Sequence, residues 1–97
     1  MKPKTPPPPK HLSNEMQGFW RKITGDYALS PEHEAILRVT CEQADRATQA
    51  REAIARDGMI LDGHRHPLIG VEAKSTELFL RGIRDLGLLE QLDAAKS

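Results

Sequence analysis

The stretch from Ser30 to Gly58, SPEHEAILRVTCEQADRATQAREAIARDG, predicts one long helix with both ends marked. Ser30 is a suitable N-cap, and Pro31 suits the first helical position because the N–H that it lacks would have no partner there. Gly58 predicts the end, since a residue without a Cβ adopts the left-handed conformation after a helix easily. About 27 residues at 1.5 Å each give a rod of roughly 40 Å, so we expect the other elements to pack on it.

Apolar and small side chains recur along this segment at steps of three and four residues, as in a helix with one apolar face. The side chains of this face are bulky in the first turns of the segment and mostly small afterwards. It fits an ordinary hydrophobic core, and its alanine-rich second half also fits a contact with another subunit. The residues of this core or oligomer face are Ile36, Leu37, Cys41, Ala44, Ala47 and Ile54.

The chain before the long helix divides into an arm and a first helix. Residues 1–11 begin MKPKTPPPPK, and prolines lack the backbone donors of a helix or sheet, so we expect a flexible, disordered arm. It is either a solvated tail or a functional arm, which would contact phosphate through its basic residues or serve as a proline-rich ligand. Ser13 then predicts the N-cap of a helix that carries Phe19 and Trp20 on its buried side. We expect Trp20 to have a structural role.

After Gly58 the pattern changes to a short apolar run, Met59 to Leu61, followed by Asp62-Gly63. This combination predicts a small extended lobe or hairpin. Pro67 predicts the start of a third helix, and Gly87 predicts its end. The fold class expected is therefore all-α, with a single helical domain over residues 12–92 and a frayed tail over residues 93–97.

Composition narrows the range of functions. The chain has 14 Lys and Arg residues and 14 Asp and Glu residues, so its net charge is zero. A neutral chain does not favour a monomer that coats nucleic acid nonspecifically. One cysteine cannot form an internal disulfide, which fits a reducing compartment. No apolar run has the length of a membrane span, and we expect no membrane contact, no signal peptide and a cytoplasmic location.

Chemical motifs are scarce. His64 and His66 with Asp62 suggest a metal site, but no third or fourth ligand follows at a recognised spacing, so we expect no metal. We find no nucleophile with a base, no paired carboxylates and no phosphate-binding glycine loop, and therefore expect neither catalysis nor a cofactor. Exposed cations that fit phosphate contact, or simply a solvated surface, are Lys10, Arg21, Lys22 and Arg65.

The landmarks of the chain, taken in order, resemble the phage terminase small subunit family over residues 9–89. They are Leu12-Ser13 before a helix with Trp20, Leu29-Ser30 before a long helix with Cys41, Gly58 before an apolar run, His66-Pro67, and Leu86-Gly87-Leu88. Two features depart from the pattern. His33 stands where an acidic residue would complete a capping box, and the tail ends soon after Leu92.

The resemblance implies a non-catalytic, helical protein that assembles into a ring-like homo-oligomer in the host cytoplasm. Such a protein recognises viral double-stranded DNA and delivers it to the large terminase subunit, which carries the ATPase and nuclease. Two alternatives remain from the sequence. One is a helix–turn–helix regulator that binds DNA as a dimer, and the other is a helical interaction module that binds no nucleic acid.

Overall fold

The computed structural model describes residues 5–88, and within them the chain forms three helices and one β-hairpin. The elements in chain order are α1 Asn14–Asp26, α2 Pro31–Asp57, β1 Ile60–Leu61, β2 His64–Arg65 and α3 Leu68–Asp85. The predicted all-α class is confirmed, including the long central helix and the short hairpin. Residues 1–4 of the predicted arm and the predicted tail, residues 93–97, lie outside the described part of the chain.

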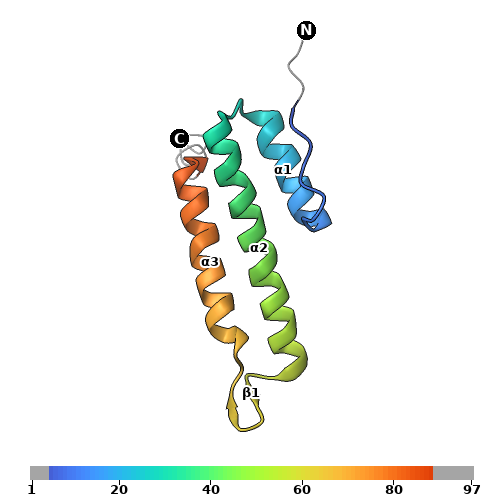
Figure 1. Ribbon diagram of the computed structural model, residues 1–97, viewed down its shortest axis with the longest axis vertical. Coiled ribbons are helices and arrows are strands. Elements are labelled where there is room, and N and C mark those ends of the chain that lie inside the picture. Colours follow the sequence, from blue (N-terminus) through green and yellow to red (C-terminus); the bar gives the residue numbers. More distant parts are fainter. Residues whose placement is uncertain (1–4, 89–97) are drawn as a thin grey trace, which may run out of the picture.

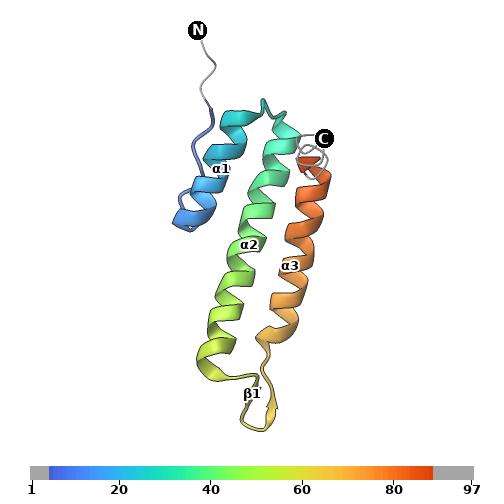
Figure 2. The same cartoon turned by 180° about the vertical axis from the view of Figure 1, so that it is seen from behind.

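The helices form an elongated body of 59 × 33 × 21 Å. Both ribbon views show α3 running antiparallel to α2 along most of its length, whereas α1 lies beside only the first half of α2 (Figures 1 and 2). The hairpin of β1 and β2 forms the far end of the body. Within residues 5–88, no helix combines the length and the hydropathy that crossing a membrane requires.

Serine hydroxyls begin the first two helices, as predicted. Ser13 Oγ accepts a hydrogen bond from the Met16 N–H at 3.1 Å, and Ser30 Oγ accepts one from the His33 N–H at 3.2 Å. Pro31 occupies the first turn of α2. The His33 ring also approaches the cap, with Nδ1 at 3.0 Å from Ser30 Oγ, so an imidazole contacts the cap at the position where the sequence lacks an acid.

Glycines end α2 and α3, although one conformation differs from the prediction. Gly58 donates its N–H to the Ile54 carbonyl at 2.7 Å with φ 87° and ψ 161°. Its φ is positive, as expected, but its ψ is extended rather than left-handed helical because the chain turns directly into β1. Gly87 has φ 75° and donates to the Arg84 carbonyl at 2.9 Å, which closes α3 as predicted.

The hairpin turns on Asp62 and Gly63, whose φ values of 53° and 77° are both positive, as in a type I′ turn. Its strands are antiparallel and pair Ile60 with Arg65 and Leu61 with His64. Pro67 then occupies the cap position directly before α3, which agrees with the predicted helix start.

The hydrophobic core lies where α1, α2 and α3 meet. Leu37 and Cys41 of α2 are fully buried, and Trp20 and Ile23 of α1 and Ile83 of α3 surround them. The alanine-rich second half of α2 is also covered, by α3 of the same chain. Ala47 is buried there, together with Ala50 and Ala53, which the predicted apolar face did not include.

The core or oligomer face predicted on α2 is therefore divided. Leu37, Cys41 and Ala47 belong to the core of the single chain, whereas Ile36, Ala44 and Ile54 are only half-buried. Small residues set the spacing of α2 and α3. A Cβ at Gly82 would overlap the Thr40 hydroxyl and lie 2.9 Å from Thr40 Cβ, so the two helices cross closely at this point.

Candidate nucleic-acid interface

The proline-rich arm packs on α1 through the single tryptophan. Trp20 is 3% exposed, and its Nε1–H donates a hydrogen bond to the Pro6 carbonyl at 2.9 Å. A run of prolines lacks the backbone N–H groups of a helix or sheet, so its carbonyl oxygens are free to accept such a bond. The described part of the arm, residues 5–11, therefore has a defined position on α1, which differs from the disordered arm that the sequence predicted.

Two acidic residues of α2 hold the junction between the arm and α1. Asp45 accepts hydrogen bonds from both the backbone N–H and the hydroxyl of Ser13, the former at 2.7 Å. Glu42 Oε2 lies 2.7 Å from Nε2 of His11. The Ser13 side chain thus caps α1 and also ties its start to the middle of α2. This explains how a short helix with limited contact to α2 is held in place.

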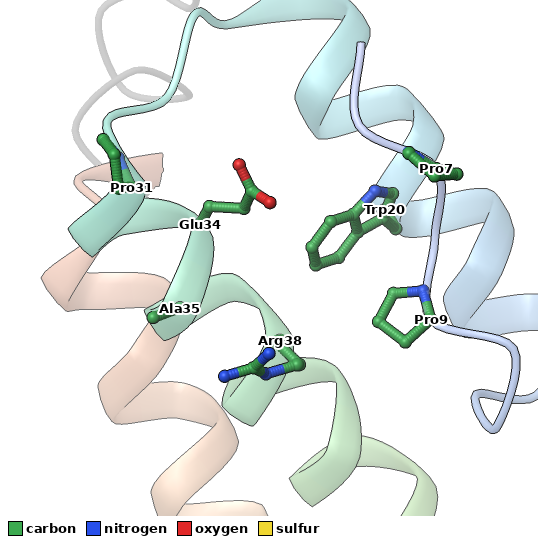
Figure 3. Close-up of a pocket in the computed structure, with 7 residues that line it drawn as sticks. All are labelled: Pro7, Pro9, Trp20, Pro31, Glu34, Ala35 and Arg38. Atoms are coloured by element: carbon green, nitrogen blue, oxygen red, sulfur yellow. The ribbon is translucent and has the colours of Figure 1, made fainter.

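A shallow pocket of about 350 Å³ opens between the arm, α1 and the first turns of α2. Figure 3 shows the Trp20 ring beside Pro7 and Pro9 of the arm, with Glu34 and Arg38 of α2 across from it. Arg38 is exposed and makes no ion pair with another residue in the described part of the chain. The pocket thus combines an apolar wall with one cation and one carboxylate. Its lining residues are Pro7, Pro9, Trp20, Pro31, Glu34, Ala35 and Arg38.

The cations that the sequence singled out separate into two locations. Lys10, Arg21 and Lys22 are exposed on the arm and α1, and Lys22 pairs with Asp26 at 3.5 Å. Arg65 is exposed on β2, in the hairpin at the far end of the molecule (Figure 1). Three of the four therefore lie on the arm and α1, and the fourth lies on the hairpin.

Arg38 is a cation that the sequence pattern did not single out. Glu34 and Glu42 stand four residues before and after it, so the pattern alone favours a neutralised helix surface. In the structure Glu42 approaches His11 instead. Only the folded arrangement of the arm against α2 shows that Arg38 lies close to the arm and to Trp20.

His66 has a structural role in place of the metal site considered from sequence. Its ring is 4% exposed, and Nδ1 accepts a hydrogen bond from the Leu68 N–H at 3.1 Å while Nε2 lies 3.0 Å from Asp57 Oδ2. These two bonds fit the neutral tautomer that carries its proton on Nε2. The bond from His66, together with Arg56, lowers the pKa of the Asp57 carboxyl. His66 thus joins the end of α2 to the start of α3.

In the described part of the chain, neither the histidines considered as metal ligands nor Cys41 forms a reactive site. Over residues 5–88, no group of three or more His, Cys, Asp or Glu side chains is placed to hold a metal ion. Cys41 is fully buried, and burial raises the pKa of its thiol to about 12, with Asp45 and Glu42 adding to the effect. A thiol held in this way is a core side chain rather than a nucleophile.

No protein-family model, curated protein or solved structure matches this chain.

Proposed function

We propose that the protein is a small terminase subunit that recognises viral DNA and delivers it to a large terminase subunit as a ring-like homo-oligomer. One observation carries the proposal. The landmarks that resemble the phage terminase small subunit family lie at the boundaries that determine this architecture. Trp20 fixes the arm and α1, Gly58 ends α2, His66 joins α2 to α3, and Gly87 ends α3.

The distribution of charge is consistent with DNA binding by an assembly. Lys10, Arg21 and Arg38 are exposed and make no ion pair with another residue of the described part of the chain. They lie on the arm, on α1 and on the adjoining half of α2. Three cations on one chain bind DNA weakly by themselves, but their repetition around an oligomer multiplies the effect through effective concentration.

The structure also bears on the helix–turn–helix regulator. Residues 27–30 form a short turn between α1 and α2, which is the connection that such a regulator requires. However, the first turn of α2 carries Glu32 and Glu34, and α2 lies between α1 and α3 in both ribbon views. A recognition helix needs a free, basic amino-terminal end to enter the major groove. These features favour the terminase subunit over the regulator.

The salt dependence of DNA binding tests the proposal. We expect the native chain to bind a labelled duplex from the adjoining viral genome at low salt, with affinity that falls steeply as salt increases. The variant with Lys10→Ala, Arg21→Ala and Arg38→Ala should bind more weakly. The slope of its log affinity against log salt concentration should become shallower by about 0.9 for each phosphate that a subunit no longer neutralises.

Arg84→Ala is the matched control. Arg84 is an exposed cation in the last turn of α3 that does not line the pocket beside Trp20. Its removal should leave both the affinity and the slope nearly unchanged. Equal decreases in affinity for the triple variant and the control would contradict a DNA site on the arm and α1. A native chain that ignores DNA even at low salt would leave the interaction module as the better explanation.

A further inference from the structure

The tip of the hairpin exposes apolar side chains to solvent. Met59 is 66% exposed, Ile60 65% and Leu61 38%, in three consecutive positions. The turn at Asp62 and Gly63 and the hydrogen bonds of His66 give this tip a fixed conformation. These side chains give both faces of the hairpin exposed apolar surface for an interaction, and Ile60 shares its face with its cross-strand partner Arg65.

A groove with matching character lies between α2 and α3 at the other end of the molecule. It has a volume of about 360 Å³ and is lined by residues from the first turns of α2 and the last turns of α3. Val39, which is 50% exposed, contributes to its wall. Gly82 lies where the two helices cross. The lining residues are Ala35, Ile36, Val39, Thr40, Leu78, Arg81, Gly82 and Asp85.

The two surfaces carry one pair of opposite charges that can meet. Arg65 is exposed beside the apolar tip, and Asp85 is exposed at the rim of the groove. Neither makes an ion pair with another residue within the range 5–88. The other charged residue of the groove, Arg81, already pairs with Glu77 at 3.4 Å. The groove therefore offers an unengaged anion, Asp85, and the hairpin offers an unengaged cation, Arg65, with the exposed Asp62 in the turn beside it.

We propose that the hairpin tip of one copy docks in the α2–α3 groove of the next copy, with Arg65 facing Asp85 of its neighbour. The occupant is a second copy, because the hairpin lies at one end of the elongated body and the helix segments that line the groove lie at the other, so the two surfaces cannot meet within a chain (Figure 1). A contact between two different surfaces is head-to-tail, and it generates a ring when the rotation closes. The inference rests on the proposed function, since it specifies the subunit contact of the proposed ring.

Two variants, each altering one surface, test the contact. Ile60→Asp places a charge on the tip, and Val39→Glu places one in the groove. Both positions are at least half exposed, so each variant should keep the native circular dichroism and denaturant midpoint. By light scattering, each variant alone should fall to the 10.8 kDa monomer. An equimolar mixture should form a 1:1 dimer and nothing larger, because only one intact tip and one intact groove can meet.

Leu80→Glu is the matched control for this experiment. Leu80 is an apolar residue of α3 that is 55% exposed, and it does not line the groove. The control should assemble like the native chain. A native chain that is monomeric, a mixture that remains monomeric, or a Val39→Glu variant that assembles normally would each overturn the proposal. The last result would mean that another surface holds the oligomer or that other residues fill the groove.

Charge reversal tests the register of the contact. Arg65→Glu and Asp85→Arg should each weaken assembly, because each brings two like charges together. The chain that carries both changes should regain it, since every contact then has opposite charges again. Failure of the double variant to recover would contradict the pairing of Arg65 with Asp85.

The outcomes for DNA and for assembly separate the two proposals. If the chain assembles through tip and groove but ignores DNA, the terminase function fails and the contact stands. If it binds DNA while neither Ile60→Asp nor Val39→Glu changes its mass, the contact fails and the function stands.

Discussion

At the residue scale, Cys41 is a thiol whose chemistry is suppressed by its surroundings. Because the raised pKa of about 12 disfavours the thiolate, the folded protein should react with a disulfide reagent only when it opens. Raising the pH from about 7 to about 9 speeds the reaction of a free thiol, whose ordinary pKa is near 8.5. We expect the native protein to react much more slowly than the protein in denaturant at both pH values, because its thiol is accessible only in the open state. Rapid labelling of the folded protein would contradict the burial of Cys41.

Gly82 is a residue whose missing side chain determines how closely α2 and α3 pack. Gly82→Ala should destabilise the fold by about 1–3 kcal/mol, because its Cβ would overlap Thr40 and the helices would have to separate. The control is Gly70→Ala in the same helix, where an added Cβ meets nothing within 4 Å. The control should be neutral or stabilise the fold by up to about 1 kcal/mol. Denaturant unfolding measures both, and equal effects would refute the close crossing.

Asp57, at the junction of α2 and α3, should make the free energy of unfolding depend on pH. The hydrogen bond from His66 lowers the pKa of Asp57 below its ordinary 3.8, so its contribution to stability is complete above the unfolded pKa. That contribution disappears as the pH falls through the folded pKa. The difference in unfolding free energy between the native chain and Asp57→Asn should therefore be constant above about pH 5 and shrink below about pH 4.

The neighbouring Asp62→Asn variant serves as the control for Asp57. Asp62 is exposed in the hairpin turn, and asparagine also tolerates the positive φ of this position. Its difference from the native chain should be smaller and should change less in acid. An Asp57→Asn difference that grows as the pH falls would contradict the role assigned to His66 and Asp57.

At the element scale, the docked arm gives a prediction through the single tryptophan. Deleting residues 1–9 removes the Pro6 acceptor and the covering prolines, so the Trp20 emission should shift to longer wavelength. Removal of the hydrogen bond should also lower stability, by about 0.5–1.5 kcal/mol. Deleting residues 1–4 leaves Pro6 in place and should change neither. Unchanged emission after the longer deletion would show that the arm does not cover Trp20.

The sequence predicted the helices and the hairpin well because their ends carry local signals. Ser13, Ser30 and Gly87 act on the backbone within a few residues, and the structure confirms each of them. The turn at Asp62 and Gly63 is equally local. Patterns of this kind depend on dihedral preferences and nearby hydrogen bonds, which a sequence states directly.

The arm and the candidate site could not be predicted in the same way, because they depend on contacts between distant segments. Nothing near Pro6 indicates that its carbonyl accepts from Trp20, 14 residues away. Likewise, Glu42 approaches His11 of the arm, 31 residues away, instead of Arg38 on its own helix. Ala50 and Ala53 were missed because alanine satisfies a buried and an exposed helix face equally well, and α3 decides between them.

At the scale of the whole molecule, the fold leaves apolar side chains exposed at both ends of an elongated body. A small domain buries a limited share of its surface, so association with further copies would cover what one chain leaves exposed. The proposed terminase subunit requires such an assembly, since the described part of one chain brings only three unpaired cations to the proposed DNA site. Assembly and DNA binding are therefore expected to occur together.

The most direct measurement is the mass of the native protein by light scattering, at low and moderate salt, with and without a duplex from the adjoining viral genome. We predict a closed oligomer much larger than a dimer that takes up DNA at low salt and releases it as salt increases. A dimer that binds DNA would contradict the proposed ring and favour the helix–turn–helix regulator. A small species that ignores DNA would contradict both the ring and the DNA site.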